Sequence, residues 1–224
     1  MKFDNFYNKH AGERCFILGN APSLSKENLS LLQDENVFVV NRGYLAKDLG
    51  LKDYTYYVCA DENVYNSAPK EIQRLVTVPR FYHYKIYKSK YYAKENYVPI
   101  KKSHSHTGLL NGHFPKSFEE GWGNTRTVAF DTSLIAYFMG FSEIYLLGVD
   151  LYHPSKDNSH FYKVESRENK SYGAYHKRTS EITTIITEFA NFFQEKKIVF
   201  KNLSRDFAFK KYMQTDLLDN IIRE

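Results

Sequence analysis

The chain has 224 residues, of which 42% are hydrophobic and 25% charged, so its composition is globular and excludes wholesale disorder. The formal net charge is only +5, from 31 Lys and Arg against 26 Asp and Glu, unlike a protein that coats nucleic acid. Two cysteines, Cys15 and Cys59, are too few for a disulfide scaffold or a four-cysteine zinc site. Both fall in apolar runs, so we expect buried thiols.

The sequence contains no run of about 18 apolar residues, the length that a membrane-spanning helix needs. Its first ten residues contain no apolar stretch of signal-peptide length. We therefore expect a cytoplasmic protein, whose membrane contact, where there is any, is peripheral. The sequence is also compatible with a homo-oligomer.

In the first half of the chain, short apolar runs alternate with turn and helix patterns. The runs that predict buried strands are residues 14–19, 37–41, 54–60 and 76–78. Two segments predict helices: residues 25–33, with Ser25 as the N-cap, and residues 69–75.

The segment from Arg80 to Lys102 differs in composition, with seven Lys or Arg against one Glu and six interleaved Tyr. We interpret residues 79–118 as a lid-like insertion or long loop outside the core. Tyrosine and lysine together are also typical of surfaces that bind single-stranded nucleic acid, but no nucleic-acid-binding motif occurs, so we expect no such partner. A lid over an anionic sugar nucleotide, a surface for anionic glycolipid headgroups, and a solvated surface with tyrosines packed on the sheet edge all explain the segment.

The second half of the chain has stronger patterns. Val128 to Met139 predicts a helix closed by Gly140, and Glu143 to Asp150 predicts a strand. An amphipathic helix is predicted at 175–196 and a last strand at 198–202. Fully apolar strands that alternate with helices predict an α/β fold: a Rossmann-like, mostly parallel sheet with helices on both faces, in a single domain over residues 1–224.

In such a sheet, ligands bind beyond the carboxyl ends of the strands. The residues that follow the predicted strands are small, polar or acidic: Gly19 to Ser23, Asn41 and Arg42, Ala60 to Asn63, and Gly148 to Tyr152. The first of these loops lacks the three glycines of the dinucleotide fingerprint, and no Walker A sequence occurs. It could still present backbone N–H groups and the Ser23 hydroxyl to a phosphate.

Two stretches resemble known families. Gly-Asn-Ala-Pro-Ser-Leu at 19–24 resembles the Gly-Asn-Gly-Pro-Ser-Leu of the bacterial sialyltransferases (glycosyltransferase family forty-two) and of the group typified by archaeal 6-hydroxymethylpterin diphosphokinase. Residues 139–152, Met-Gly-Phe-Ser-Glu-Ile-Tyr-Leu-Leu-Gly-Val-Asp-Leu-Tyr, resemble the Leu-Gly-Tyr-Lys-Glu-Ile-Tyr-Leu-Ser-Gly-Ile-Asp-Phe-Tyr of the sialyltransferases. Asn41 and His176 fall where the sialyltransferases have a nucleotide-contacting Asn and a catalytic His. The resemblance covers roughly residues 14–202.

The resemblance implies an inverting glycosyltransferase that moves sialic acid or a similar keto-sugar from a CMP-activated donor to a hydroxyl of a surface glycan or glycolipid, in lipopolysaccharide or capsule biosynthesis. His176 would be the general base, and Tyr152 would hydrogen-bond the phosphate of the leaving CMP, with no cofactor required. Arg126, at a predicted helix start, would favour an anion. The nucleotide contacts would be Gly19, Asn20, Ser23, Asn41, Asp61, Thr127 and Asp150, and the acceptor or phosphate contacts His160 and Tyr162.

Two departures from the sialyltransferase pattern keep alternatives open. Thr127-Val128-Ala129 stands where the sialyltransferases have Thr-Ser-Gly, so a non-catalytic nucleotide-binding subunit of a glycan-synthesis complex is one alternative. Asp61 replaces their Asn after the third strand and is more like the diphosphokinase group. A magnesium-dependent diphosphokinase, with Asp61 and Asp150 holding the metal, is therefore another.

His153 and His160 flank a loop that contains Asp157, with Asp150 just before them, and side chains of these types can ligate a metal ion. Their spacing matches no standard metal-binding motif, so we expect no metal site there.

Overall fold

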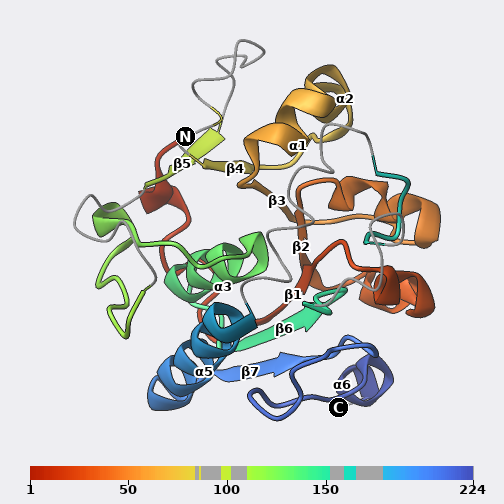
Figure 1. The fold of residues 1–224 in the computed structure, drawn as a ribbon. Coiled ribbons are helices and arrows are strands. Elements are labelled where there is room, and N and C mark those ends of the chain that lie inside the picture. Colours follow the sequence, from red (N-terminus) through yellow and green to blue (C-terminus); the bar gives the residue numbers. More distant parts are fainter. Residues whose placement is uncertain (84–85, 87–96, 102–109, 152–158, 165–178, 224) are drawn as a thin grey trace.

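A seven-stranded, all-parallel sheet forms the centre of the protein (Figure 1). This computed structural model describes residues 1–83, 86, 97–101, 110–151, 159–164 and 179–223. The strands are β1 (Arg14–Leu18), β2 (Asn36–Val40), β3 (Tyr56–Cys59), β4 (Arg80–His83), β5 (Tyr97–Ile100), β6 (Glu143–Leu147) and β7 (Val199–Asn202). They lie in the order β5-β4-β3-β2-β1-β6-β7, which confirms the predicted α/β fold with a parallel sheet.

Helices cover both faces of this sheet. The α-helices are α1 (Glu62–Ser67), α2 (Pro69–Leu75), α3 (Val128–Phe138), α5 (Thr179–Glu195) and α6 (Leu218–Arg223). The 3₁₀ helices are η1 (Phe3–Asn5), η2 (Pro22–Lys26), η3 (Leu29–Leu32), η4 (Gly43–Leu49) and η6 (Phe118–Glu120). Side chains of α3, α5 and η1 pack on one face of the sheet, and those of η2, η3, η4, α1, α2 and α6 pack on the other. None of the helices among the described residues is long and apolar enough to cross a membrane.

Alternation along the central strands explains the two cores. In β1, Cys15 and Ile17 point into the layer under α3 and α5, whereas Phe16 and Leu18 point into the opposite layer. Cys15 and Cys59 form no disulfide and are buried, as predicted, and burial raises the pKa of the Cys15 thiol well above its usual value.

The amphipathic spacing predicted for the long helix is confirmed over the described part of α5. Its apolar stripe, Ile182, Ile185, Ile186, Phe189 and Phe193, is buried. The ring of Phe189 stacks on Phe130 of α3, with the centroids 4.6 Å apart, which joins the two helices over the sheet.

Two strands lie where we predicted a lid or loop. The prediction is wrong for Arg80–His83 and Tyr97–Ile100, which form β4 and β5 at one edge of the sheet. In β4 the buried Phe81 is followed by Tyr82 and His83, which are buried too. In β5, Pro99 separates the buried Val98 and Ile100, so neither strand shows a continuous aliphatic run in the sequence. The prediction of a strand at 76–78 is also wrong, because Val76 is the C-cap of α2. Residues 84–85, 87–96 and 102–109 of the predicted insertion lie outside the described residues.

The helix predicted at 25–33 is instead two short 3₁₀ helices, η2 and η3. Pro22 opens η2 and Ala21 is its N-cap, so the predicted capping role of Ser25 is wrong. The Ser25 hydroxyl instead donates to the carbonyl oxygen of Pro22 at 2.8 Å. Proline at the first helical position and a side-chain bond back to the turn favour a short turn over a continuous helix.

The strand order reverses between β1 and β6. From β1 the chain builds β2 to β5 on one side, then returns to place β6 on the other side of β1. At this switch point the two strands end very close together, because a Cβ atom on Gly19 would lie only 2.2 Å from the carbonyl oxygen of Gly148. Gly148 itself has a φ of +62° and faces Leu24, so both strand ends require glycine.

Replacing Gly19 with alanine should therefore be severely destabilising. The added methyl group would meet backbone, which cannot move as a side chain does, so Gly19→Ala should lower the free energy of unfolding by more than about 3 kcal/mol or prevent folding. Gly12 is a control, since it has a φ of +82° but open space around it. Gly12→Ala should cost about 1 kcal/mol from backbone strain alone. Urea denaturation measures both, and equal losses would contradict the close approach of β1 and β6.

Candidate functional site

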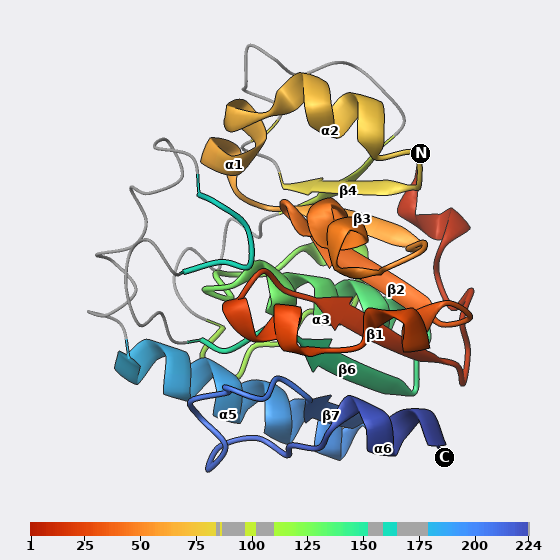
Figure 2. The same ribbon diagram turned by 90° about the vertical axis from the view of Figure 1, so that its right-hand side faces the viewer.

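The carboxyl ends of the strands form one edge of the sheet, which we call the carboxyl edge. In Figure 2 the strands run toward the left, where segment 159–164 and the first turn of α5 also lie. The loops that follow β1, β2, β3 and β6 all start at this edge. The edge therefore gathers most of the described residues that the sequence nominated, and it contains the switch point where α/β sheets bind ligands.

Two asparagines link neighbouring strand ends at this edge. The Asn20 side-chain amide donates to the carbonyl oxygen of Val40 at 3.0 Å, and the Asn41 side-chain oxygen accepts from the Ala60 amide at 3.4 Å. Asn41 adopts a φ of +53°, which turns the chain sharply after β2. The Asn20 side-chain oxygen is buried and accepts no hydrogen bond from the described residues. An unmet buried acceptor of this kind needs an explanation, and a bound ligand is one.

Segment 159–164 folds against the same strand ends. The Phe161 amide donates to the Asn20 carbonyl oxygen at 3.0 Å, and the Arg42 guanidinium lies 5.7 Å from the centre of the Tyr162 ring. Arg42 is buried and also donates to the Ser67 hydroxyl at 3.0 Å. The structure thus brings Asn20 and Tyr162, far apart in sequence, to one place together with Arg42.

The sequence placed Arg42 among the residues at the strand ends, next to Asn41, but gave it no role in the site. A basic residue two positions after the apolar run of β2 was the available signal. His160, which was selected, lies beside Tyr162 with the ring centroids 5.1 Å apart. One of its ring nitrogens, Nδ1, is 2.8 Å from the Ser159 hydroxyl, which fixes the orientation of the imidazole.

The N-terminus of α3 also reaches the carboxyl edge, because α3 runs back across the sheet to lead into β6. The Thr127 hydroxyl caps the helix by accepting from the Ala129 amide at 3.3 Å. Arg126 adopts a φ of +64°, and its guanidinium forms an ion pair with Glu181 of α5 at 2.9 Å. This pair, which the sequence did not reveal, holds the first turn of α5 against the start of α3.

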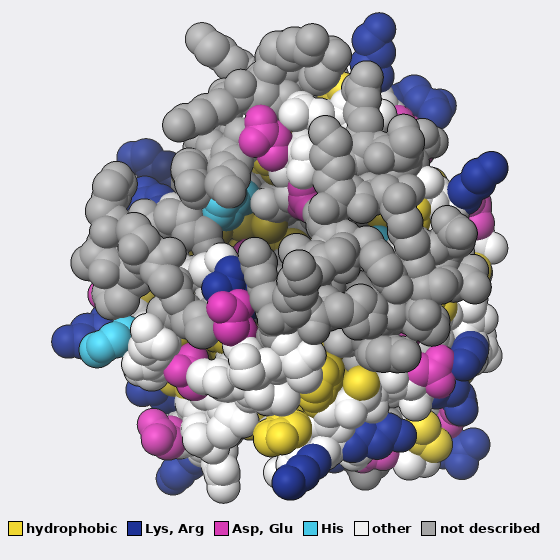
Figure 3. Space-filling model, in the orientation of Figure 1, with side chains coloured by type: hydrophobic (Ala, Val, Ile, Leu, Met, Phe, Trp, Pro, Cys, Tyr) yellow, Lys and Arg dark blue, Asp and Glu magenta, His cyan; other side chains and the backbone are white. Residues whose placement is uncertain are grey.

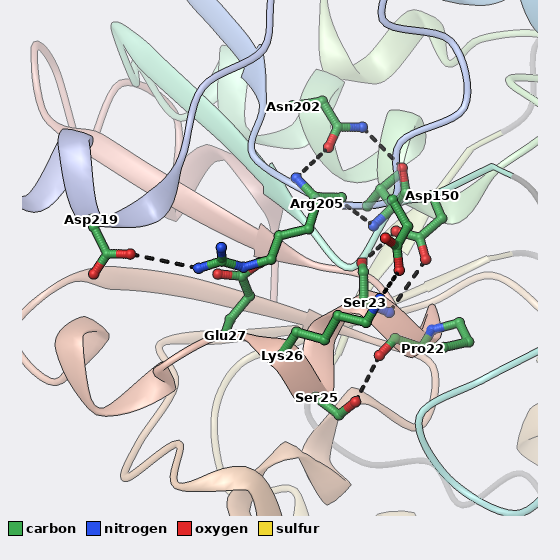
Figure 4. A network of polar contacts seen from close by, with 12 residues as sticks. Pro22, Ser23, Ser25, Lys26, Glu27, Asp150, Asn202, Arg205 and Asp219 are labelled. Carbon is green, nitrogen blue, oxygen red and sulfur yellow. Dashed lines mark hydrogen bonds and ion pairs between the residues drawn. The ribbon is translucent and has the colours of Figure 1, made fainter.

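Ser23 and Asp150 face each other across the switch point (Figure 4). The Ser23 hydroxyl donates to one carboxylate oxygen of Asp150, and the Ser23 amide donates to the other at 3.3 Å. Both residues are buried. Burial raises the pKa of Asp150 and the two bonds from Ser23 lower it, with burial the larger effect. In the structure this pair joins the loop after β1 to the loop after β6, while its contact with a nucleotide stays a prediction.

The segment after β7 supports the β6 loop from the other side. The Val149 amide donates to the Ser204 hydroxyl at 2.8 Å, and the Asn202 side chain donates to the Val149 carbonyl oxygen at 2.9 Å. The Ala208 amide donates to the Asp150 carbonyl oxygen at 3.1 Å. A cavity of about 310 Å³ lies beyond β7 and is lined by Ser204, Arg205, Lys210, Thr215, Asp216 and Leu217.

The two carboxylates that the diphosphokinase alternative assigns to magnesium both accept hydrogen bonds within the protein. Asp61 caps α1, accepting from the amides of Asn63 at 2.7 Å and Val64 at 3.4 Å, and Asp150 accepts from Ser23. Across the part of the chain that the structure describes, no three His, Cys, Asp or Glu side chains are grouped so that they could hold a metal ion.

Two predicted site residues, Tyr152 and His176, lie outside the described residues, as do His153 and Asp157. In the sequence, Tyr152 follows the buried Leu151, and His176 stands three positions before Thr179, where α5 begins in the described chain. The lysines of the predicted basic lid between 85 and 94 are also outside the described residues. On the face in Figure 3, the described Lys and Arg side chains are scattered among acidic and uncharged ones.

Comparisons with known proteins concern the fold of the whole chain. No protein-family model and no curated protein matches the sequence. The structure is similar to the sialyltransferase CstII from Campylobacter jejuni in complex with cytidine-5'-monophosphate, with a TM-score of 0.54 and 15% identity over 92% of this chain and 85% of that chain. A CstII complex with CMP-3FNeuAc gives a TM-score of 0.52 and 14% identity, over 96% and 85% of the two chains.

A third similar structure is the MAf glycosyltransferase from Magnetospirillum magneticum AMB-1, with a TM-score of 0.53 and 12% identity. The match covers 96% of this chain but 36% of that longer chain. The chain therefore has a sialyltransferase-like fold, which confirms the predicted resemblance at the level of fold.

The Ser23–Asp150 contact yields a stability prediction. Ser23→Ala removes a hydroxyl donor from a buried carboxylate and should lower the free energy of unfolding by about 2 kcal/mol. Ser25→Ala is the matched control, because Ser25 lies on the same 3₁₀ helix with an exposed side chain, and it should cost less than about 0.5 kcal/mol. Urea denaturation at neutral pH compares the two, and losses of the same size would show that the buried contact is not a distinct stabilising interaction.

Proposed function

We propose that this protein is an inverting glycosyltransferase that takes a sugar, sialic acid or a similar keto-sugar, from a CMP-activated donor. The observation that supports it most is the pair Asn20 and Asn41 on adjacent strand ends beside the switch point, in a fold shared with a sialyltransferase whose structures contain CMP or a CMP-sugar analogue. Side-chain amides both donate and accept hydrogen bonds, as recognition of a nucleoside requires. The unmet Asn20 side-chain oxygen would accept from the nucleoside.

The reaction needs two kinds of assistance. The acceptor hydroxyl attacks the anomeric carbon of the donor sugar as the bond from that carbon to the phosphate oxygen breaks, and CMP leaves with the bonding electron pair. His176 takes the proton from the attacking hydroxyl, a role that suits imidazole near neutral pH. A single displacement of this kind inverts the anomeric configuration.

Negative charge develops on the phosphate as CMP leaves, and donors aimed at the phosphate stabilise it. We assign this role to the Tyr152 hydroxyl. Arg42 and Tyr162, which lie together beside Asn20, would add a cation and a further donor. His160, beside Tyr162, would contact the acceptor or the phosphate. No cofactor enters this scheme, and the acceptor is a surface glycan or glycolipid reached by peripheral association with the membrane.

Nucleotide binding is the first test. Isothermal calorimetry of the full chain, without added metal, should show binding of CMP and weaker or no binding of UDP, GDP and ATP. Binding of ATP alone, and only with magnesium, would contradict the proposal and favour a diphosphokinase. Binding of CMP without transfer or hydrolysis of any CMP-activated sugar would favour a non-catalytic subunit.

The base role of His176 is tested by substitution. His176→Ala should lower the rate of sugar transfer roughly 100-fold or more while leaving CMP affinity nearly unchanged, because the base acts on the acceptor. His113→Ala is the control, since His113 is exposed and has no assigned role, and it should leave the rate unaltered. Transfer at the full rate by the His176 variant would remove it from the mechanism.

A further inference from the structure

We propose that Arg205 is a positioning residue for the nucleotide site: from the segment after β7, it fixes the loop after β1 at the distance from the β6 loop that nucleotide binding requires. The inference rests on the proposed function, because it concerns the same site. Its basis is an ion-pair chain that joins the end of η2 to the start of α6 (Figure 4).

The ion-pair chain has an unusual member in Glu27, whose side chain is only 1% exposed although it ends a short surface helix. The Nε atom of Arg205 lies 3.1 Å from its carboxylate, and Nη2 of the same guanidinium lies 3.6 Å from Asp219 of α6. A buried carboxylate is costly unless it is paired, so Glu27 depends on Arg205. Burial raises the pKa of Glu27 and Arg205 lowers it, in keeping with this dependence.

The same short stretch of chain also holds the β6 loop. Ser204, next to Arg205, accepts from the Val149 amide, and Ala208 donates to the Asp150 carbonyl oxygen. Lys26, next to Glu27, pairs with Asp206. Residues 204–208 therefore contact both loops that flank the switch point, and they set the two loops relative to each other.

The loop that Arg205 holds leads directly to the proposed nucleotide contacts. Glu27 lies four residues after Ser23, whose hydroxyl and amide bind Asp150. The Ala21 amide donates to the Gly148 carbonyl oxygen at 2.9 Å, which holds the chain next to Asn20 against the end of β6. Releasing Glu27 would loosen the loop behind these contacts without removing any group that touches the nucleotide. Arg205 would thus act on affinity through η2.

The test compares CMP affinity and thermal stability in the full chain. Arg205→Met keeps the length of the side chain but leaves Glu27 buried and unpaired, so it should lower the melting temperature and weaken CMP binding about tenfold. The double variant Glu27→Gln with Arg205→Met removes the buried charge but leaves the loop untied. Its melting temperature should return most of the way to that of the wild type, while its CMP binding should stay weak. If the ion pair only stabilised the fold, CMP affinity would return together with the melting temperature.

Arg14 provides the matched control. It pairs with Glu35 at 2.7 Å and donates to Ile221 of α6 at 3.1 Å, but it lies at the amino end of β1, away from the site. Arg14→Met should lower the melting temperature and leave CMP affinity unchanged. Unchanged CMP affinity in Arg205→Met, or affinity that recovers with the melting temperature in the double variant, would overturn the positioning role. Failure of the wild-type chain to bind CMP would instead contradict the proposed function.

Discussion

The ends of β1 and β6 approach each other so closely that they fix the course of both loops that follow them. Gly19 and Gly148 leave no room for a side chain between them, and the Ser23–Asp150 pair then closes the two loops over the gap. A parallel sheet whose order reverses at this point must present both strand ends to one crevice. The reversal of strand order between β1 and β6 therefore explains both the need for glycine at the two strand ends and the location of the candidate site.

Polar and strained residues gather at this edge. Three of the six described non-glycine residues with a positive φ, namely Asn41, Arg126 and Leu151, stand at the carboxyl edge. Such φ values are unfavourable for residues with a side chain. Buried polar groups there, such as Asp150 and Arg42, need hydrogen bonds that only a folded edge provides. Strain and buried polarity that persist together are typical of binding sites, because selection for stability alone would remove them.

The sequence predicts the central sheet well, because β1, β2, β3 and β6 are buried on both faces and read as unbroken apolar runs. It fails at β4 and at the edge strand β5, where arginine, histidine, tyrosine and proline residues interrupt the apolar pattern. It locates Asn20 and Asn41 because they follow apolar strands. It could not reveal the partners of Arg126 and Arg205, because ion pairs between distant segments leave no local pattern.

We propose that a cytidine nucleotide binds at the carboxyl ends of β1 and β2. A crystal structure of the full chain grown with CMP would show where the nucleotide lies. The nucleoside should lie beside Asn20 and Asn41, with the phosphate toward Arg42 and Tyr162. A nucleotide bound elsewhere, for example in the cavity beyond β7 that Lys210 and Leu217 line, would contradict it.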